Sequence, residues 1–171
     1  ARADGENAPP METGLTNKTV LVTGGSRGIG KAIARAFYQE GARVVICSRN
    51  VTKLVGAAKE IGEIVCLRGD VTKEAAKIVA RLDHLDVLIN NAGGMEHFET
   101  FEKTTAKTWR DAYELNVVSA VEMSRAAIPL LKQAKGAIVN IASIAGREPM
   151  TAGPDYGASK AALLHFTKSL A

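Results

Sequence analysis

Tyr156 and Lys160 are the residues of this sequence whose types and spacing most directly suggest chemistry. They are four positions apart in a segment that we expect to be helical, so both side chains would lie on one face. An ammonium group beside a phenol favours the ionised phenolate, which makes the pair a usable acid or base near neutral pH. Ser143, thirteen residues before Tyr156 at the end of an expected strand, can hydrogen-bond a substrate oxygen and stabilise its developing charge. Each of these residues alone is more often a surface or turn residue, so the prediction rests on the set.

A glycine-rich turn follows the first apolar run of the chain. The segment 23-TGGSRGIG-30 lies between this strand-like run and an amphipathic helical pattern. A helix that begins at such a turn presents its first backbone N–H groups and its positive dipole end, which favour phosphate. Glycine is needed where the backbone bends sharply or approaches a ligand closely, as at Gly24, Gly28 and Gly30, and Ser26 adds a hydroxyl donor. A turn that only connects two elements is the alternative, but the strand–turn–helix context favours a nucleotide site.

The second strand-like run ends without the acidic residue that would hydrogen-bond the ribose of NAD. That acid is expected about 20 residues after the glycine turn, and the chain reads Cys47-Ser48-Arg49 there instead. Arg27 in the turn and Arg49 can together clamp a further phosphate group, because a guanidinium forms charge-assisted, bidentate bonds with it. Either arginine alone is more often a solvated surface charge. The pair, with the acid absent, favours a 2′-phosphate and therefore NADP(H).

Apolar runs alternate with helical patterns along the chain, and this alternation predicts the fold. Strands are expected at residues 19–23, 43–48, 63–67, 85–90 and 136–142, and helices at residues 28–40, 51–61, 73–82, 105–133 and from about 155 onward. Pro129 is expected to kink or interrupt the end of the long fourth helix. Strands that are apolar throughout and alternate with helices indicate a parallel sheet covered on both faces. The predicted fold class is therefore α/β, a doubly wound parallel sheet.

The composition is that of an ordinary globular protein and argues against several classes of function. The 171 residues are 46% hydrophobic and 23% charged, with a formal net charge of +4. The charges form no run or stripe, so no nucleic-acid partner is expected, and no apolar segment is long enough for a membrane span. Cys47 and Cys66 are expected to be buried free thiols in apolar strands. His84, His97 and His165 are not arranged as metal ligands, so no metal site is predicted.

Five short motifs stand in an order that is highly specific as a set. Besides the glycine turn they are 90-NNAG-93, Asn116 within 115-LNVVS-119, Ser143, and 156-YGASK-160. This set resembles the short-chain dehydrogenase/reductase family, from about residue 16 to the C-terminus. The resemblance implies a Rossmann-like sheet with strand order 3-2-1-4-5. It also implies a dinucleotide-binding and catalytic domain over residues 17–171, after a polar segment, residues 1–16, that we expect to be a flexible leader.

The resemblance further implies a role for each matching residue. Tyr156 would give a proton to a substrate carbonyl oxygen while the nicotinamide delivers hydride to the carbon. Lys160 would also bond the nicotinamide ribose, and Asn116 would hold a water that links Lys160 to a proton relay. The NNAG segment is expected to border the adenosine ribose and to be partly structural. The expected cofactor contacts, besides Tyr156 and Lys160, are Gly24, Ser26, Arg27, Gly28, Ile29, Gly30, Arg49, Asp70, Val71, Asn90, Ala92 and Gly93.

The sequence departs from the family's pattern in two places. Asn90 lies only twenty positions after Asp70, so the helix between them is expected to be short. The chain ends at Ala171, eleven residues after Lys160, where the family continues through two further strands and a lid over the substrate. We therefore expect a partial chain that lacks the last two strands and most of the substrate pocket.

These observations predict an oxidoreductase that transfers hydride between NADP(H) and a carbonyl or alcohol substrate. Ketones, aldehydes, sugars and 3-oxoacyl thioesters all remain open as substrates. The alternative is a truncated, non-catalytic NADP-binding or interaction module. We expect a cytoplasmic protein, with an organelle matrix as the alternative. The family commonly forms homodimers and homotetramers through the long helix and the final helix, where close approach is allowed by Gly157, Ala158, Ala161 and Ala162.

Overall fold

Runs of β-branched and other apolar residues form the strands of one parallel sheet. In the computed structural model of the protein, the described residues are 12–95, 99–149 and 153–171. His97 and most of the expected leader lie outside them. Within them, five parallel strands pair in the order β3-β2-β1-β4-β5, which confirms the predicted fold class and strand order. The strands are β1 (Thr19–Thr23), β2 (Arg43–Ser48), β3 (Val65–Arg68), β4 (Val87–Asn90) and β5 (Ala137–Asn140).

Helices connect successive strands and cover both faces of the sheet. The helix expected to be short is α3, which has five residues. The α-helices of the described residues are α1 (Gly28–Gln39), α2 (Val51–Ile61), α3 (Ala75–Val79), α4 (Ala106–Tyr113), α5 (Ser119–Ala134) and α6 (Pro154–Leu170).

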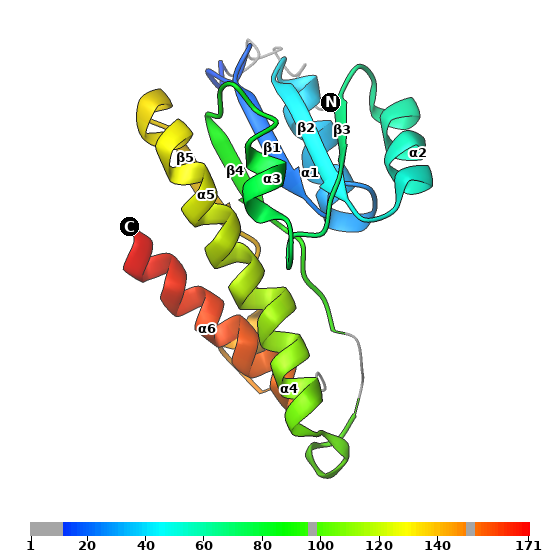
Figure 1. The fold of residues 1–171 in the computed structure, drawn as a ribbon, viewed down its shortest axis with the longest axis vertical. Coiled ribbons are helices and arrows are strands. Elements are labelled where there is room, and N and C mark those ends of the chain that lie inside the picture. Colours follow the sequence, from blue (N-terminus) through cyan, green and yellow to red (C-terminus); the bar gives the residue numbers. More distant parts are fainter. Residues whose placement is uncertain (1–11, 96–98, 150–152) are drawn as a thin grey trace, which may run out of the picture.

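The hydrophobic core is divided by the sheet into two layers. Successive residues of a strand point to opposite faces, so Val20 and Val22 of β1 pack with α1 and α2, while Leu21 packs with α3 and α5. β1 lies at the centre of the sheet, and these three residues are fully buried. Figure 1 shows α1 and α2 on one side of the strands and α3 and α5 on the other. This double coverage explains why the central strands β1, β2 and β4 are apolar, whereas the edge strands leave Val65 of β3 and Val139 of β5 exposed.

The structure differs from the predicted long fourth helix in two details. The helix is divided into α4 and α5 by a π-helical segment, η2 (Glu114–Val118), and α5 continues through Pro129 to Ala134, so Pro129 does not interrupt it. The expected kink at Pro129 stays a prediction. A proline removes one helical hydrogen bond and strains the preceding turn. α5 continues past it because Met123, Ala127 and Leu131 are buried on its opposite side, in the core layer beneath α3. Packing therefore outweighs the local effect of Pro129, which lies on the exposed side.

The start of α1 carries an apolar residue, Ile29, that the sequence analysis expects to contact the cofactor. In the structure Ile33 and Phe37 pack against the core, but the side chain of Ile29 is 66% exposed. Ile29 lies in the first turn of α1, next to the glycine turn. An apolar side chain exposed at this position faces the cavity described below.

The last helix packs within the chain through small residues. α6 lies beside α4 (Figure 1) and packs on η3 (Ile144–Gly146), the segment that follows β5. A Cβ atom on Gly157 would lie 3.0 Å from the Ala145 carbonyl oxygen, so Gly157 serves an internal contact. Assembly into dimers or tetramers stays a prediction. No helix within the described residues is both long and apolar enough to cross a membrane.

Candidate active site and cofactor cavity

The carboxyl ends of the strands open onto a cavity of about 790 Å³. It is bounded by the glycine turn after β1, the ends of β2 and β3, the segments after β4 and β5, and α6. This is where open parallel sheets bind ligands. The predicted site residues that line it are Gly24, Ser26, Arg27, Gly28, Ile29, Gly30, Arg49, Asp70, Val71, Ala92, Gly93, Tyr156 and Lys160.

The glycine turn has the geometry of an anion site. Gly28 has a φ of +54°, in the left-handed region that favours glycine, and Gly30 touches the Gly24 carbonyl so closely that a side chain has no room. The first turn of α1 carries no acidic residue, and its N-cap residue, Arg27, forms no side-chain cap. The first N–H groups of α1 are therefore not neutralised by a carboxylate, which leaves the positive end of the helix facing the cavity.

The segment after β4 is held against the glycine turn by two residues that the sequence analysis missed. Asn91 Nδ2 donates to the Thr23 carbonyl at 2.9 Å and to the Gly24 carbonyl at 3.4 Å. The Thr23 hydroxyl accepts from the backbone N–H groups of Asn91 and Ala92, both at 2.9 Å. These bonds join the carboxyl ends of β1 and β4, so the two walls of the cavity keep a fixed separation.

Asn90 does not line the cavity, although it was predicted to contact the cofactor. Its side chain is buried between β4 and α5, where Nδ2 donates to Ser124 Oγ at 3.0 Å and to Asn140 Oδ1 at 2.8 Å. Successive strand residues face opposite ways, so of the two adjacent asparagines it is Asn91 that faces the cavity. The NNAG segment was expected to be partly structural, and Asn90 is the residue of this segment with a structural role.

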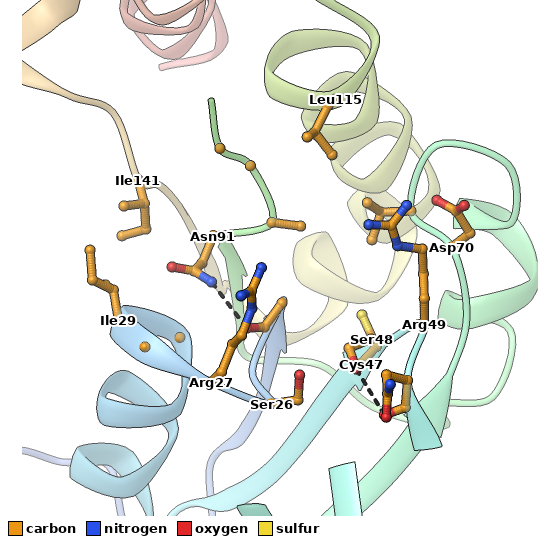
Figure 2. Close-up of a pocket in the computed structure, with 18 of the residues that line it drawn as sticks. Ser26, Arg27, Ile29, Cys47, Ser48, Arg49, Asp70, Asn91, Leu115 and Ile141 are labelled. Carbon is orange, nitrogen blue, oxygen red and sulfur yellow. Dashed lines mark hydrogen bonds between the residues drawn. The ribbon is translucent and has the colours of Figure 1, made fainter. Parts of the chain in front are cut away.

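Arg27 and Arg49 approach the cavity from two different elements. Figure 2 shows Arg27 rising from the glycine turn and Arg49 extending from the end of β2, with Asp70 beside it. Desolvation raises the pKa of Asp70, but hydrogen bonds from the Thr72 hydroxyl and N–H, with the Arg49 guanidinium and Lys73, hold it below its ordinary value. Asp70 is thus ionised at neutral pH, and its negative charge partly offsets the positive charge of Arg49.

Tyr156 and Lys160 lie together on α6 at another part of the cavity wall. Lys160 is buried, its Nζ donates to the Ile141 carbonyl at 2.8 Å, and it lies 5.9 Å from the centre of the Tyr156 ring. Burial lowers the pKa of Lys160 to about 8. Its ammonium group is therefore mostly charged at neutral pH and beside the phenol, as acid–base chemistry requires.

Asn116 is fully buried in the π-helical segment η2 and ties it to the loop after β4. Its Oδ1 accepts from the Gly94 N–H at 2.9 Å, and its Nδ2 donates to the Gly94 and Ala112 carbonyls at 3.0 Å. A Cβ atom on Gly93 would lie 2.8 Å from Asn116 Oδ1 and 3.3 Å from Lys160 Nζ, so the three residues adjoin. The role of Asn116 in holding a relay water stays a prediction.

Ser143 lies at the start of η3, and its hydroxyl accepts from the Ala145 N–H at 3.2 Å. It is half-buried and is not among the residues that line the cavity. The hydroxyl proton is still available as a donor, because this bond uses only an oxygen lone pair. η3 packs directly on α6, which brings Ser143 to the same region as the Tyr156 helix.

Two other kinds of chemistry find no support at this site. Burial raises the pKa of the Cys47 thiol to about 12, so this cavity residue stays protonated and is not a nucleophile. Both cysteines are free, as expected, but only Cys47 is buried, since Cys66 lies on the edge strand β3 and is half-buried. Among the described residues, no group of histidine, cysteine and acidic side chains is arranged to hold a metal ion.

Comparison with known proteins decides the family. Residues 18–171 match the family model described as short chain dehydrogenase. The chain belongs to the short-chain dehydrogenase/reductase family. The match covers nearly the whole chain and confirms the resemblance drawn from the five motifs.

Members of the short-chain dehydrogenase/reductase family with related sequences differ in the reactions for which they are named. L-fucose dehydrogenase of Rattus norvegicus is 38% identical over 162 residues, which are 91% of this chain and 60% of that protein. Ketoacyl reductase HetN of a Nostoc species is 36% identical, over 92% of this chain and 58% of that protein. The chain thus spans about three fifths of the length of these relatives.

Two solved structures have the same fold as this chain. The Pseudomonas aeruginosa RhlG/NADP active-site complex superposes with a TM-score of 0.86 at 33% identity, covering 92% of this chain and 67% of the other. A short-chain dehydrogenase/reductase from Mycobacterium ulcerans has a TM-score of 0.83 at 31% identity, covering 88% and 60%.

Several cavity residues of this short-chain dehydrogenase/reductase were not found from the sequence. Most adjoin residues that were predicted, so extending each motif by one or two positions would have found them. Lys53 gave no such signal, because it lies four positions from Arg49 and a basic residue in a helix is unremarkable by type. The missed residues are Cys47, Ser48, Asn50, Lys53, Gly69, Asn91, Gly94, Met95, Leu115, Ile141 and Ala142.

Proposed function

We propose that the protein is an NADP(H)-dependent oxidoreductase that interconverts a carbonyl compound and an alcohol. The observation that carries this proposal is a single cavity lined both by the Tyr156–Lys160 pair and by the arginines Arg27 and Arg49. An acid–base pair and a cluster of phosphate-binding cations are both needed when a phosphorylated cofactor reacts with a substrate oxygen. A cavity of about 790 Å³ is large enough for a dinucleotide.

The residues around the cavity fit this cofactor. The start of α1 and the glycine turn would hold the pyrophosphate, because this helix end is free of carboxylates. Arg27 and Arg49 would hold a 2′-phosphate, and no carboxylate stands at the end of β2 to repel it. A bound nicotinamide would supply or accept the hydride at the substrate carbon.

The chain's own residues would then handle the proton at the substrate oxygen. In the reductive direction Tyr156 Oη donates its proton to that oxygen, and the phenolate that remains is stabilised by the nearby Lys160 ammonium. The Ser143 hydroxyl, which has a free proton, donates a hydrogen bond to the same oxygen and stabilises its charge. In the oxidative direction the phenolate removes the alcohol proton.

The names of the relatives suggest the classes of substrate to test. The sequence relatives include an L-fucose dehydrogenase and a ketoacyl reductase. A sugar hydroxyl and a 3-oxoacyl carbonyl both react at one carbon–oxygen bond, which is the chemistry that Tyr156 and Ser143 can assist. We therefore propose sugars and 3-oxoacyl thioesters as the first substrates to examine.

The test uses the protein in the longest form that its gene encodes. NADPH and NADH oxidation are followed with ketones, aldehydes and 3-oxoacyl thioesters, and NADP⁺ reduction is followed with sugars. We expect turnover with a preference for the phosphorylated cofactor, and Tyr156→Phe should lower kcat/KM by about 10² to 10⁴-fold because the proton donor is lost. Tight NADPH binding without turnover would instead support a non-catalytic binding module. A Tyr156→Phe variant with undiminished activity would overturn the role of Tyr156 as the proton donor.

A further inference from the structure

Lys53 is a cation on the rim of the cofactor cavity with no assigned role. It lines the cavity together with Arg27 and Arg49 but belongs to a different element, the first turn of α2. The side chain of Asn50 caps this helix by accepting from the Lys53 N–H at 2.9 Å. The cap defines where the helix begins, so the backbone position from which the Lys53 side chain extends is well determined.

The ammonium group of Lys53 is not used by the protein itself. Within the described part of the chain it forms no ion pair or hydrogen bond, whereas Lys31, on the neighbouring helix α1, bonds Glu60 at 2.7 Å. Two uncharged polar side chains that also line the cavity are already engaged: the Ser48 hydroxyl donates to the Asn50 carbonyl at 3.5 Å, and the Asn50 amide oxygen caps α2. What this rim offers a ligand is therefore positive charge.

The charge of a 2′-phosphate calls for more than the two arginines. A phosphate monoester carries about −1.5 to −2 charges at pH 7. Arg49 also interacts electrostatically with the Asp70 carboxylate, whose negative charge partly cancels the positive charge of Arg49. Arg27 and Arg49 carry two positive charges and Asp70 one negative charge, so this group alone would leave such a phosphate incompletely neutralised. Among the described residues that line the cavity, Lys53 is the remaining lysine or arginine outside the Tyr156–Lys160 pair.

We propose that Lys53 contacts the 2′-phosphate of NADP(H) and helps to set the preference for NADP(H) over NAD(H). This assignment rests on the proposed cofactor. Lysine carries a point charge on a flexible stem, while arginine presents a rigid fork. Lys53 would thus contribute charge, and the two arginines would contribute both charge and orientation.

The experiment compares two probes that differ only in the phosphate concerned. Adenosine 2′,5′-bisphosphate and adenosine 5′-monophosphate are titrated calorimetrically into the full-length protein at low ionic strength. Lys53→Met should weaken binding of the bisphosphate about five- to tenfold and leave the monophosphate unchanged, because one partly exposed charge contact is lost. Lys53→Arg should keep affinity within about twofold. Lys59→Met, on the same helix but outside the cavity, is the matched control and should change neither affinity.

The outcomes separate this assignment from the proposed function. If the unmodified protein binds both probes equally, the preference for NADP(H) fails and the role of Lys53 fails with it. If it prefers the bisphosphate, and Arg49→Ala removes that preference while Lys53→Met does not, the cofactor proposal stands and the Lys53 assignment alone is overturned. A selective loss with Lys53→Met, absent in Lys59→Met, supports the assignment.

Discussion

At the scale of single residues, the position of Lys160 has the clearest chemical consequence. Its Nζ is held by the Ile141 carbonyl at 2.8 Å in a buried environment, and burial lowers its pKa to about 8. A charged lysine in water keeps its proton to a much higher pH. The Lys160 charge, which we propose stabilises a Tyr156 phenolate, is therefore present at neutral pH and lost in mildly alkaline solution.

We expect kcat/KM for NADPH to fall as the pH rises through about 8. This parameter reports groups of the free enzyme, and the folded protein loses the Lys160 proton in that range because its pKa is lowered to about 8. Steady-state rates between pH 6.5 and 10 would measure the inflection. Lys160→Met is the control, since it should be slow throughout and lack this inflection. A profile that is flat to pH 10 in the unmodified enzyme would contradict the assignment.

The residue types of the site could largely be predicted from the sequence, but their orientations could not. Tyr156, Lys160 and the two arginines have side-chain chemistry that narrows their role, and their spacing places them at strand ends or on one helix face. Asn90 and Asn91 are identical in type and adjacent in sequence. Only the register of β4, which turns Asn90 toward α5, decides that Asn91 faces the cavity.

At the scale of elements, the strands and most helices follow from apolar periodicity, while the π-helical segment does not. The apolar pattern continues across η2 without a break, so the sequence predicts one helix. What distinguishes the segment is the pair of hydrogen bonds between Asn116 and Gly94, which joins residues 22 apart in the chain. Such tertiary contacts are outside the reach of local patterns.

The contact between η3 and α6 gives a prediction about the alignment of two elements. A Cβ atom on Gly146 would lie 2.6 Å from the Lys160 carbonyl carbon and 2.7 Å from the Ala161 nitrogen, which are backbone atoms that cannot move aside. Gly146→Ala should therefore separate η3, which carries Ser143, from the helix of Tyr156. We expect a loss of about 1–3 kcal/mol in the free energy of unfolding and a lower kcat.

Gly56→Ala provides the matched control for this change. Gly56 lies in the interior of α2 with no atom within 4 Å of its would-be Cβ, so alanine should stabilise the protein by about 0.5–1 kcal/mol without changing kcat. Denaturant titration and steady-state turnover of both variants would measure these effects. Unchanged turnover in Gly146→Ala would show that the contact does not align Ser143 with Tyr156.

At the scale of the whole molecule, the two ends of the sheet differ: one surrounds the cavity, and the other is joined by hydrogen bonds. The carboxyl ends of the strands surround the cavity, whereas the opposite ends are joined around Asp86. Its carboxylate accepts from the Thr19 N–H at 2.8 Å and from Lys18 Nζ at 3.0 Å, and its carbonyl accepts from the Ala137 N–H at 2.8 Å. Asp86 therefore links β1, β4 and β5 at the end of the sheet remote from the chemistry.

This arrangement predicts an acid-sensitive contribution to stability. Desolvation raises the pKa of Asp86, but the Thr19 N–H, Lys18 and His84 together hold it below its ordinary value. Because the folded state favours the ionised carboxylate, the stabilisation is complete above the unfolded pKa of about 3.9 and is lost as the pH falls through the lower folded value. Stability should therefore be nearly constant from pH 7 to about 5 and decline below about pH 4.

Asp86→Asn tests this contribution, because asparagine keeps the size of the side chain and removes its charge. We expect the variant to lose about 1–2 kcal/mol of unfolding free energy at pH 7, since a charge-assisted bond from Thr19 becomes a neutral one and the partners Lys18 and His84 are half exposed. Urea titrations at pH 7 and pH 3.5 should show this difference shrinking at the lower pH. Asp83→Asn, an exposed neighbour, should match the unmodified protein at both. An Asp86→Asn deficit that is equally large at pH 3.5 would place the effect in packing, and a variant with full activity per folded molecule would confirm that this end of the sheet serves stability alone.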